Sequence, residues 1–337
     1  MSELIYIEPR STEAAFHFAA EEYCMRHFQG KEPIWMIWQT EKCAMLGRNQ
    51  IAAAEIDLAE AEKSGVQIVR RSSGGGTIFT DLGALLFTVI LPYGENDDAK
   101  QMAMCAAAEP VIRALYQMGI PARLEGRNDI LVDGKKVSGL AQFIAKGKLC
   151  SHGSLLFDTD LEELTRFLKT DEGKIKSKAL RSMRSRVTNL IEYLESPCPP
   201  RIFWDRLKQH LFEDLDIREY HLTEQDIREI EAIRAEKYAN PEWTFGKAPK
   251  FSFANAKRFP GGKIETYLEI EKGRISECRI HGDFLSLVSV RSLEEQLKGR
   301  TYRVEDVRRT LETTDLRPCL GSITAEELIA CMFNIVT

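Results

Sequence analysis

The sequence predicts a globular α+β protein of two domains, and three observations support this prediction. Its 337 residues are enough for two domains with separate hydrophobic cores. Hydrophobic residues make up 44% and charged residues 29%, an ordinary balance for a globular protein. Strand and helix patterns both occur along the chain, and a loop-like stretch with prolines, aromatics and glycine lies between residues 240 and 250. We therefore expect one domain over residues 1–245 and a smaller one over residues 246–337.

Strand patterns and helix patterns alternate along the first part of the chain. Apolar runs typical of strands lie at residues 4–8, 33–40, 66–73 and 84–93. Helical spacing follows Ser11, a plausible N-cap, and returns at residues 52–65 and 97–120, where Pro110 is expected to kink or split the helix. Shorter strands separated by Asp-Gly and Lys-Gly turns are expected between residues 123 and 157. Helical patterns then dominate residues 161–236.

The smaller part has a simpler pattern. Residues 263–285 are expected to form a β-hairpin that turns at the sequence EKGR. Two amphipathic helices are expected over residues 292–300 and 303–312. No internal repeat and no low-complexity segment is present in the chain.

Charge and cysteine usage exclude several classes of protein. The net charge of −5 argues against a general nucleic-acid binder, and no apolar run approaches the ~18 residues that span a bilayer. The N-terminal residues contain acids and no apolar signal core, so we expect no export signal. The eight cysteines form no CxxC pair, and the six histidines show no metal-ligand spacing. These features predict a cytoplasmic protein that binds neither membrane nor nucleic acid.

The segment RRSSGGGTIFTD, residues 70–81, is the first candidate for a functional site. Ordering three glycines is costly, which suggests that something approaches this backbone closely. Glycine-rich turns commonly hold phosphates, although neither a P-loop nor a GxGxxG fingerprint is present. A tight turn between two strands is the alternative interpretation. The two flanking arginines, Arg70 and Arg71, favour a phosphate-facing role because arginine is a fork-shaped phosphate partner.

Three further segments contain candidate residues. In GRNDILVDGKKVSGLAQ, residues 126–142, a hairpin through the Asp-Gly turn would bring Asp129 close to Lys136. A surface hairpin with solvated charges is the alternative there. His152 begins an apolar strand, where a histidine is more often structural than catalytic. Residues 174–186 contain six basic residues and no acid, so they are either a solvated face or a site for polyphosphate or an acidic partner.

Five sequences, in order and at roughly the expected spacing, resemble the bacterial lipoate–protein ligase A family. They are RRSSGGGTIFTDLGALLFT, GRNDILVDGKKVSG, HGSLLF, SKALRSMRSRVTNL and WTFGKAPKFS. The resemblance extends over nearly the whole chain. It implies an α+β fold of the biotin/lipoate ligase type, with mixed and antiparallel sheets and a small α+β C-terminal accessory domain. It also implies an ATP-dependent enzyme that converts lipoate to lipoyl-AMP with release of pyrophosphate and then lipoylates a lysine.

The same resemblance implies the partners. MgATP and lipoate would be substrates, and no tightly bound prosthetic group is expected. The acceptors would be lipoyl domains of 2-oxoacid dehydrogenase E2 subunits, the glycine-cleavage H protein, or both. We expect a monomer, with a hinge near residues 243–250 between the two domains.

Site residues follow from the matching positions. Lys136 would be catalytic, between the acyl carbonyl and the α-phosphate, and Asp129 would lie near the nucleotide and Mg²⁺. Contacts to ATP and the adenylate would come from Arg71, Ser73, Gly74, Gly75, Gly76, Thr77, Ile78, Phe79, Asp129, Lys136 and Lys178. Contacts to lipoate would come from Gly76, Ile78, Lys136, Ala141, His152 and Gly153.

The chain departs from the family pattern at three positions. Thr80 replaces a histidine, Ala84 an asparagine that contacts nucleotide and metal, and Phe143 an arginine found in some members. Three alternative functions are considered. A biotin–protein ligase would need a GRGRxGR-type loop, which the chain lacks. An octanoyl or lipoyl transferase would act through a thioester, for which Cys150 is the candidate. A non-catalytic binder of lipoate or lipoyl domains is the third.

Overall fold

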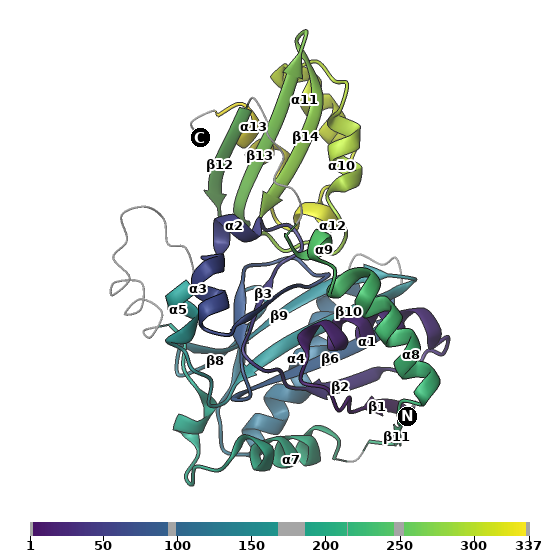
Figure 1. Ribbon diagram of the computed structural model, residues 1–337, viewed down its shortest axis with the longest axis vertical. Helices are drawn as coiled ribbons and strands as arrows, with labels where there is room; N and C mark the ends of the chain where they lie inside the picture. The colour runs from purple at the N-terminus through teal and green to yellow at the C-terminus, as the bar shows by residue number, and fades with distance from the viewer. Residues whose placement is uncertain (1–2, 94–98, 168–185, 214, 246–252, 335–337) are drawn as a thin grey trace.

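The computed structural model describes residues 3–93, 99–167, 186–213, 215–245 and 253–334 (Figure 1). Its largest element is an eight-stranded sheet in the order β11-β1-β2-β6-β10-β9-β8-β7. The strands are β1 (Leu4–Ile7), β2 (Ile34–Trp38), β6 (Ala84–Pro92), β7 (Arg123–Glu125), β8 (Asp129–Val132), β9 (Lys135–Ala145), β10 (Lys148–Leu156) and β11 (Ile217–Glu219).

Parallel and antiparallel pairs are mixed in this sheet. Strand β1 runs parallel to both β2 and β11, whereas the remaining neighbours are antiparallel. The Asp-Gly and Lys-Gly turns join β8 to β9 and β9 to β10, as the sequence predicted. The prediction missed β11, where helix was expected. This three-residue edge strand is largely exposed and lacks an apolar pattern, so only its pairing with β1 identifies it.

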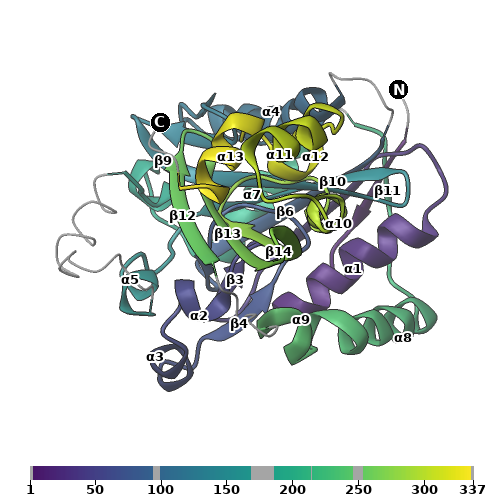
Figure 2. The ribbon, with the colours of Figure 1, turned by 90° about the horizontal axis from the view of Figure 1, so that it is seen from above.

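Helices cover both faces of the large sheet (Figures 1 and 2). One hydrophobic core lies beneath α4 and α7, and a second lies beneath α1 and α8. Pro110 lies inside α4 without ending it, which excludes the split, one of the two expected effects, and leaves the kink a prediction. The four helices are α1 (Ala14–His27), α4 (Ala99–Gln117), α7 (Pro200–Leu211) and α8 (Glu224–Ile233).

A second sheet, in the order β4-β3-β5, packs over the α1 face of the large sheet. Its strands are β3 (Cys43–Leu46), β4 (Gln67–Arg70) and β5 (Ile78–Thr80). Successive residues of β3 face opposite sides: Cys43 and Met45 join the core beneath α1, whereas Ala44 and Leu46 pack beneath short helices. These helices are α2 (Ala52–Glu55), α3 (Leu58–Lys63) and α5 (Glu163–Phe167).

The single helix predicted over residues 52–65 is two helices. The first ends at Glu55, and Asp57 caps the second, because its side chain accepts a hydrogen bond from the Glu60 N–H. Three shorter elements complete the large part of the chain. They are the 3₁₀ helix η1 (Leu190–Tyr193), the π-helical turn η2 (Arg234–Tyr238) and α9 (Pro241–Phe245).

The C-terminal part forms its own sheet and core, seen in green and yellow at the top of Figure 1. Strands β13 and β14 form the expected hairpin, with Lys272 and Gly273 at positive φ in the turn. The two expected amphipathic helices are present, whereas β12, α12 and α13 were not predicted. The elements are β12 (Phe253–Phe259), β13 (Gly262–Glu271), β14 (Arg274–Gly282), α10 (Arg291–Leu297), α11 (Val304–Glu312), α12 (Arg317–Leu320) and α13 (Ala325–Met332).

The observed mixture of sheets and helices confirms the predicted α+β class. The proposed boundary at residue 245 adjoins residues 246–252, which lie outside the described residues, so this boundary stays a prediction. Among the described residues, none of the helices combines the length and the apolar character needed to cross a bilayer.

Candidate functional site

A cavity of about 430 Å³ lies between the two sheets of the large part and the 282–287 segment of the C-terminal part. Its size is within the usual range for small-molecule sites. Eleven residues predicted from the sequence line it: Arg71, Gly75, Gly76, Thr77, Ile78, Phe79, Asp129, Lys136, Ala141, His152 and Gly153. Segments far apart in the sequence therefore contribute to one site.

Lys136 and Asp129 form the polar centre of this cavity. Lys136 Nζ lies 2.7 Å from Asp129 Oδ1, and both side chains are a little over one-third exposed. A β-bulge between β8 and β9 shifts the register beside Lys136. Gly139 leaves room for the lysine, because a Cβ there would come within 2.8 Å of Nζ. The hairpin therefore brings the two predicted residues together, as its turn required.

The backbone of Lys136 is held from the other side by residues 186–188. Its N–H donates to the Arg186 carbonyl at 2.7 Å, and its carbonyl accepts from the Thr188 N–H at 3.1 Å. This segment begins with Arg186, the last residue of the basic stretch 174–186, for which a solvated face, a polyphosphate site and a site for an acidic partner were the interpretations. Residues 168–185, including Lys178, lie outside the described residues.

The two arginines before the glycines donate to backbone carbonyls. Arg71 donates to the carbonyls of Met45, Gly74 and Gly76 and to Ser73 Oγ. Arg70 donates to five carbonyls, and burial lowers the pKa of each guanidinium to about 10. Both are therefore charged at neutral pH. The phosphate contact predicted for Arg71 stays a prediction, and in this structure Arg71 shapes the glycine loop.

The three glycines have different surroundings. A Cβ at Gly74 would lie 2.4 Å from Ser286 N and 2.8 Å from the Phe284 carbonyl, so the C-terminal part closely approaches this glycine. Gly75 has a φ of +94°, which disfavours other residues. Only Gly76 has open space where a side chain would be, with Asp283 Cβ at 3.9 Å.

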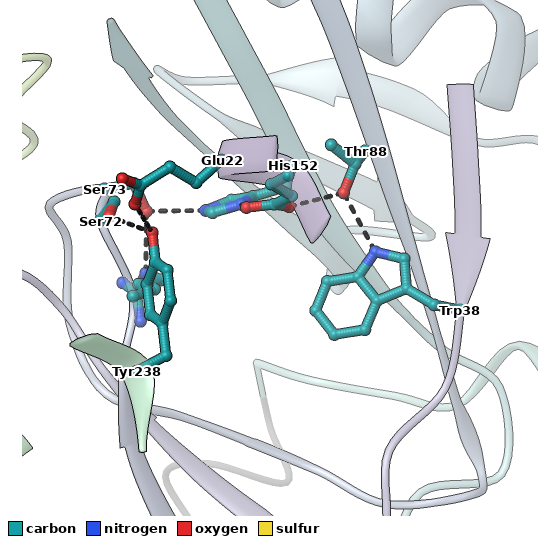
Figure 3. A network of polar contacts seen from close by, with 9 residues as sticks. Glu22, Trp38, Ser72, Ser73, Thr88, His152 and Tyr238 are labelled. Atoms are coloured by element: carbon teal, nitrogen blue, oxygen red, sulfur yellow. Dashed lines mark hydrogen bonds and ion pairs between the residues drawn. The ribbon is translucent and has the colours of Figure 1, made fainter. Parts of the chain in front are cut away.

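A buried polar chain crosses the deep end of the cavity (Figure 3). His152 Nε2 lies 2.7 Å from Ser73 Oγ, and its Nδ1 lies 3.0 Å from Glu21 Oε1. Thr88 Oγ1 donates to the same carboxylate oxygen at 2.6 Å and accepts from Trp38 Nε1 at 3.0 Å. The predicted site residue Ser73 thus contacts His152, which lines the cavity, whereas neither Ser73 nor Gly74 lines the cavity itself.

Ser72 belongs to a second polar cluster behind the loop. Its hydroxyl lies 2.7 Å from Tyr238 Oη, and Lys237 Nζ donates to it at 3.0 Å. Both Tyr238 and Lys237 also donate to Glu22 at 2.8 Å, and the contact from Tyr238 is drawn in Figure 3. Glu21 is therefore linked to Ser73 through His152. The next residue of α1, Glu22, is linked to Ser72 through Tyr238 and Lys237.

Sequence reasoning missed the apolar end of the cavity and part of its polar rim. Phe18 lies on α1, and Trp38 ends β2, so both appeared only as buried positions of regular elements. Asp283 and Leu285 come from the other domain, and no local motif indicates that contact. The missed residues that matter most are Phe18, Glu21, Trp38, Met45, Leu86, Arg127, Gly139, Asp283 and Leu285.

Each departure from the family pattern occupies a buried position. Thr80 Oγ1 lies 2.7 Å from Thr40 Oγ1, and Ala84 is fully buried. Phe143 packs 6.0 Å from the His152 ring, between centroids. Cys150 is also fully buried and does not line the cavity, and burial raises the pKa of its thiol.

Comparison with known proteins identifies the family. The family described as "Lipoyl protein ligase A/B catalytic domain" matches residues 13–212, and "Bacterial lipoate protein ligase C-terminus" matches residues 248–332. The lipoate-protein ligase LplJ of Bacillus subtilis (strain 168) is 38% identical over 94% of this chain and 96% of its own length.

Solved structures show the same fold. P. falciparum LipL1 in complex with lipoate superimposes with a TM-score of 0.75 at 22% identity, covering 93% of this chain and 95% of LipL1. A lipoate-protein ligase A bound with ATP superimposes with a TM-score of 0.61 at 27% identity, covering 73% of this chain and 99% of that ligase. The two family matches together extend over both parts of the chain. The chain therefore belongs to the bacterial lipoate–protein ligase family and is an enzyme of that class.

Proposed function

We propose that this enzyme activates lipoate with ATP to lipoyl-AMP and pyrophosphate, and then transfers the lipoyl group to a lysine of an acceptor protein. The observation that carries this proposal is the position of Lys136 and Asp129 in a cavity whose far end is apolar. A single cavity can thus hold an acyl chain at one end and phosphate at the other.

The two ends of the cavity differ in chemistry. Phe18, Trp38, Met45 and Leu86 line one end, which suits the hydrocarbon chain and dithiolane ring of lipoate. Lys136 and its neighbours line the other, where the carboxylate of lipoate and the α-phosphate of ATP would meet. The buried charges of Arg70 and Arg71 beneath the glycine loop add positive potential that favours the phosphates.

Lys136 would stabilise charge that develops during both steps. When lipoate attacks ATP, negative charge grows on the α-phosphate and on the departing pyrophosphate. When the acceptor lysine attacks lipoyl-AMP, charge grows on the carbonyl oxygen and then on departing AMP. A fixed ammonium beside these oxygens binds the transition state more strongly than the ground state. No enzyme nucleophile is needed, because the mixed anhydride is already activated.

Magnesium would enter with ATP as part of the substrate complex. Asp129 supplies a carboxylate beside the predicted phosphate position, and Mg²⁺ in such sites usually takes one or two carboxylates plus phosphate oxygens and water. Asp129 fits this role. The acceptors we propose are lipoyl domains of 2-oxoacid dehydrogenases and the glycine-cleavage H protein, with the enzyme acting as a cytoplasmic monomer.

The structure argues against a thioester mechanism through Cys150. A nucleophilic cysteine must reach the substrate and exist partly as thiolate. Cys150 is fully buried outside the cavity lining, and burial raises the pKa of its thiol. The non-catalytic alternative does not account for the close pair of Lys136 and Asp129 inside the cavity.

An exchange assay tests the proposal. Radioactive pyrophosphate should enter ATP only when lipoate is present, because exchange requires reversible formation of lipoyl-AMP. A lipoyl-domain acceptor should then gain one lipoyl group in the presence of ATP. Acyl transfer without ATP that is lost in Cys150→Ser would instead establish the thioester mechanism. Lipoate binding without exchange would establish a binder.

A further inference from the structure

Three side chains with different metal-binding chemistry meet behind the deep end of the cavity. Glu21, Cys150 and His152 each offer one ligand atom, and these atoms all lie within 4.8 Å of one another. All three residues are buried: Glu21 is 1% exposed, Cys150 0% and His152 7%. The ligase chemistry proposed above uses neither the thiol of Cys150 nor a metal at this position.

We infer that Glu21, Cys150 and His152 form a binding site for a single thiophilic divalent cation, for which zinc is the best fit. A thiolate, an imidazole and a carboxylate are the three ligand types that zinc takes in proteins. Tetrahedral zinc would separate such ligand atoms by about 3.3–3.8 Å, given its usual bond lengths. Shifts of about 1 Å or less would bring the three side chains into that geometry.

The surroundings already provide the outer hydrogen bonds that metal ligands need. With the cation on His152 Nδ1, the Nε2–H would donate to Ser73 Oγ, which lies 2.7 Å away. Thr88 Oγ1 donates to Glu21 Oε1 at 2.6 Å and holds that carboxylate in place. Such contacts orient the imidazole and the carboxylate and increase metal affinity.

Charge and access also favour a divalent cation. The charge of a zinc ion would be balanced by the Glu21 carboxylate and by the Cys150 thiolate that forms when zinc displaces its proton. His152 lines the cavity, so the cation would enter from there and direct its fourth position, filled by water, toward the cavity. Zinc and the tail of a bound acyl chain would then compete for the same end.

Equilibrium dialysis of the full chain with Zn²⁺ tests the site directly. We expect the wild type to bind one equivalent, and Cys150→Ser to bind it at least about tenfold more weakly, because losing even an outer hydrogen-bond partner of a metal ligand typically weakens binding about that much. Cys43→Ser is the matched control: Cys43 is 1% exposed in the same hydrophobic core but lies outside the cluster, so its loss should leave the affinity unchanged. Cys150→Val serves as a second variant if the serine impairs folding, with the melting temperature as the check.

Two further readouts place the cation. Co²⁺ should give a sulfur-to-metal charge-transfer band in the wild type that is absent from Cys150→Ser and present in Cys43→Ser. Saturation with lipoate should weaken Zn²⁺ binding. The inference is wrong if the wild type binds no stoichiometric Zn²⁺, or if Cys150→Ser binds it as the wild type does. Unchanged Zn²⁺ affinity in the presence of lipoate would contradict the placement at the cavity end.

Discussion

Lys136 is the one side chain to which we assign charge stabilisation in both proposed steps. Lys136→Ala should leave the fold intact, because the side chain is 37% exposed and contributes little to the core. It should lower the rates of lipoyl-AMP formation and of transfer by at least about a hundredfold, the scale of losing one preorganised charge-stabilising donor. Pyrophosphate exchange and single-turnover transfer from lipoyl-AMP measure the two rates separately.

The neighbouring Lys135 provides the control. Lys135→Ala removes the same charge from the same strand without touching the cavity lining. It should keep nearly the wild-type rates. Wild-type turnover in Lys136→Ala, or equal losses in both variants, would contradict the assignment of Lys136.

His17 makes the stability of the fold depend on pH. Its Nε2 lies 2.8 Å from the Ser11 carbonyl, its ring stacks on Trp38, and burial lowers its pKa from 6.5 to about 4. The unfolded chain therefore binds more protons than the folded one between these two pH values. The free energy of unfolding should therefore include the whole contribution of neutral His17 above pH 6.5. It should fall by up to about 3 kcal/mol as the pH drops to about 4.

The non-titrating variant His17→Gln isolates this effect. It should remove most of the decline that His17 causes between pH 6.5 and 4, measured by urea unfolding at several pH values. An identical pH slope in the wild type and the variant would show that His17 is not the group responsible.

In the glycine loop, residues 74–76, Gly74 contacts the C-terminal part of the chain, and Gly76 lines the cavity in which we propose that ligand binds. Gly74→Ala should destabilise the fold by about 1–3 kcal/mol, because its Cβ would overlap Ser286 N and the Phe284 carbonyl. Gly76→Ala meets only Asp283 Cβ at 3.9 Å, so its stability should change by less than about 0.5 kcal/mol. Its affinity for lipoyl-AMP should nevertheless fall, seen as a smaller ligand-induced rise in melting temperature. If lipoyl-AMP raised the melting temperature of Gly76→Ala as much as that of the wild type, this glycine would not face the ligand.

Arg70, at the end of β4, links the 47–50 segment to residues 243–244 at the end of the large part. Its guanidinium donates to the Trp243 and Thr244 carbonyls, and the Trp243 indole donates back to the Arg70 carbonyl at 2.9 Å. Arg70→Lys cannot make the forked contacts and should cost about 2–4 kcal/mol of stability. Hydrogen exchange should accelerate in α9. Arg123→Lys, at an exposed pair, should change neither quantity. An unchanged rate of hydrogen exchange in α9 of Arg70→Lys would show that Arg70 does not hold this helix in place.

At the level of elements, the sequence predicted what depends on short-range patterns. The Asp-Gly and Lys-Gly hairpins and the approach of Lys136 to Asp129 required only a turn type and alternating strands. The edge strand β11 depends on a distant partner, and the break between α2 and α3 depends on the Asp57 cap within a helical composition. The carbonyl partners of Arg70 and Arg71 were likewise not predictable, because they include residues far away in the sequence, such as Met45 and Trp243, and no local pattern indicates such contacts.

For the whole molecule, the contact between the domains should respond to ligand. The N–H groups of Gly74 and Gly75 donate to the carbonyls of Ser286 and Phe284, at 3.3 and 3.1 Å. A phosphate that took these donors would displace the 282–287 segment, and the Asp283 carboxylate near the cavity would also disfavour an anion. Small-angle scattering should therefore differ between the free enzyme and its lipoyl-AMP complex. Identical profiles would contradict this coupling.

The order of motifs along the chain was sufficient to indicate the family, but not the shape of the complete site. Residues from Arg71 to Phe79 and from Asp129 to Gly153 were found because each segment has its own pattern. Phe18 and Trp38 were missed because they lie in elements whose patterns are those of an ordinary core. Asp283 and Leu285 were missed because their place depends on how two separately folded cores meet.

The contact between the glycine loop and the 282–287 segment has an evolutionary consequence. Four main-chain hydrogen bonds join the segment to the large part: besides the two glycine donors, the Gly282 N–H donates to the Asn49 carbonyl, and the Ile144 N–H donates to the Leu287 carbonyl. One side-chain hydrogen bond, from Asn49 Nδ2 to Ser286 Oγ, accompanies them. Every residue except proline has the same main-chain donor and acceptor, so these four hydrogen bonds place little constraint on which side chains stand at the residues that make them. Correlated substitution between the two domains should therefore be weak among homologues, and methods that infer proximity from paired changes should underestimate this interface.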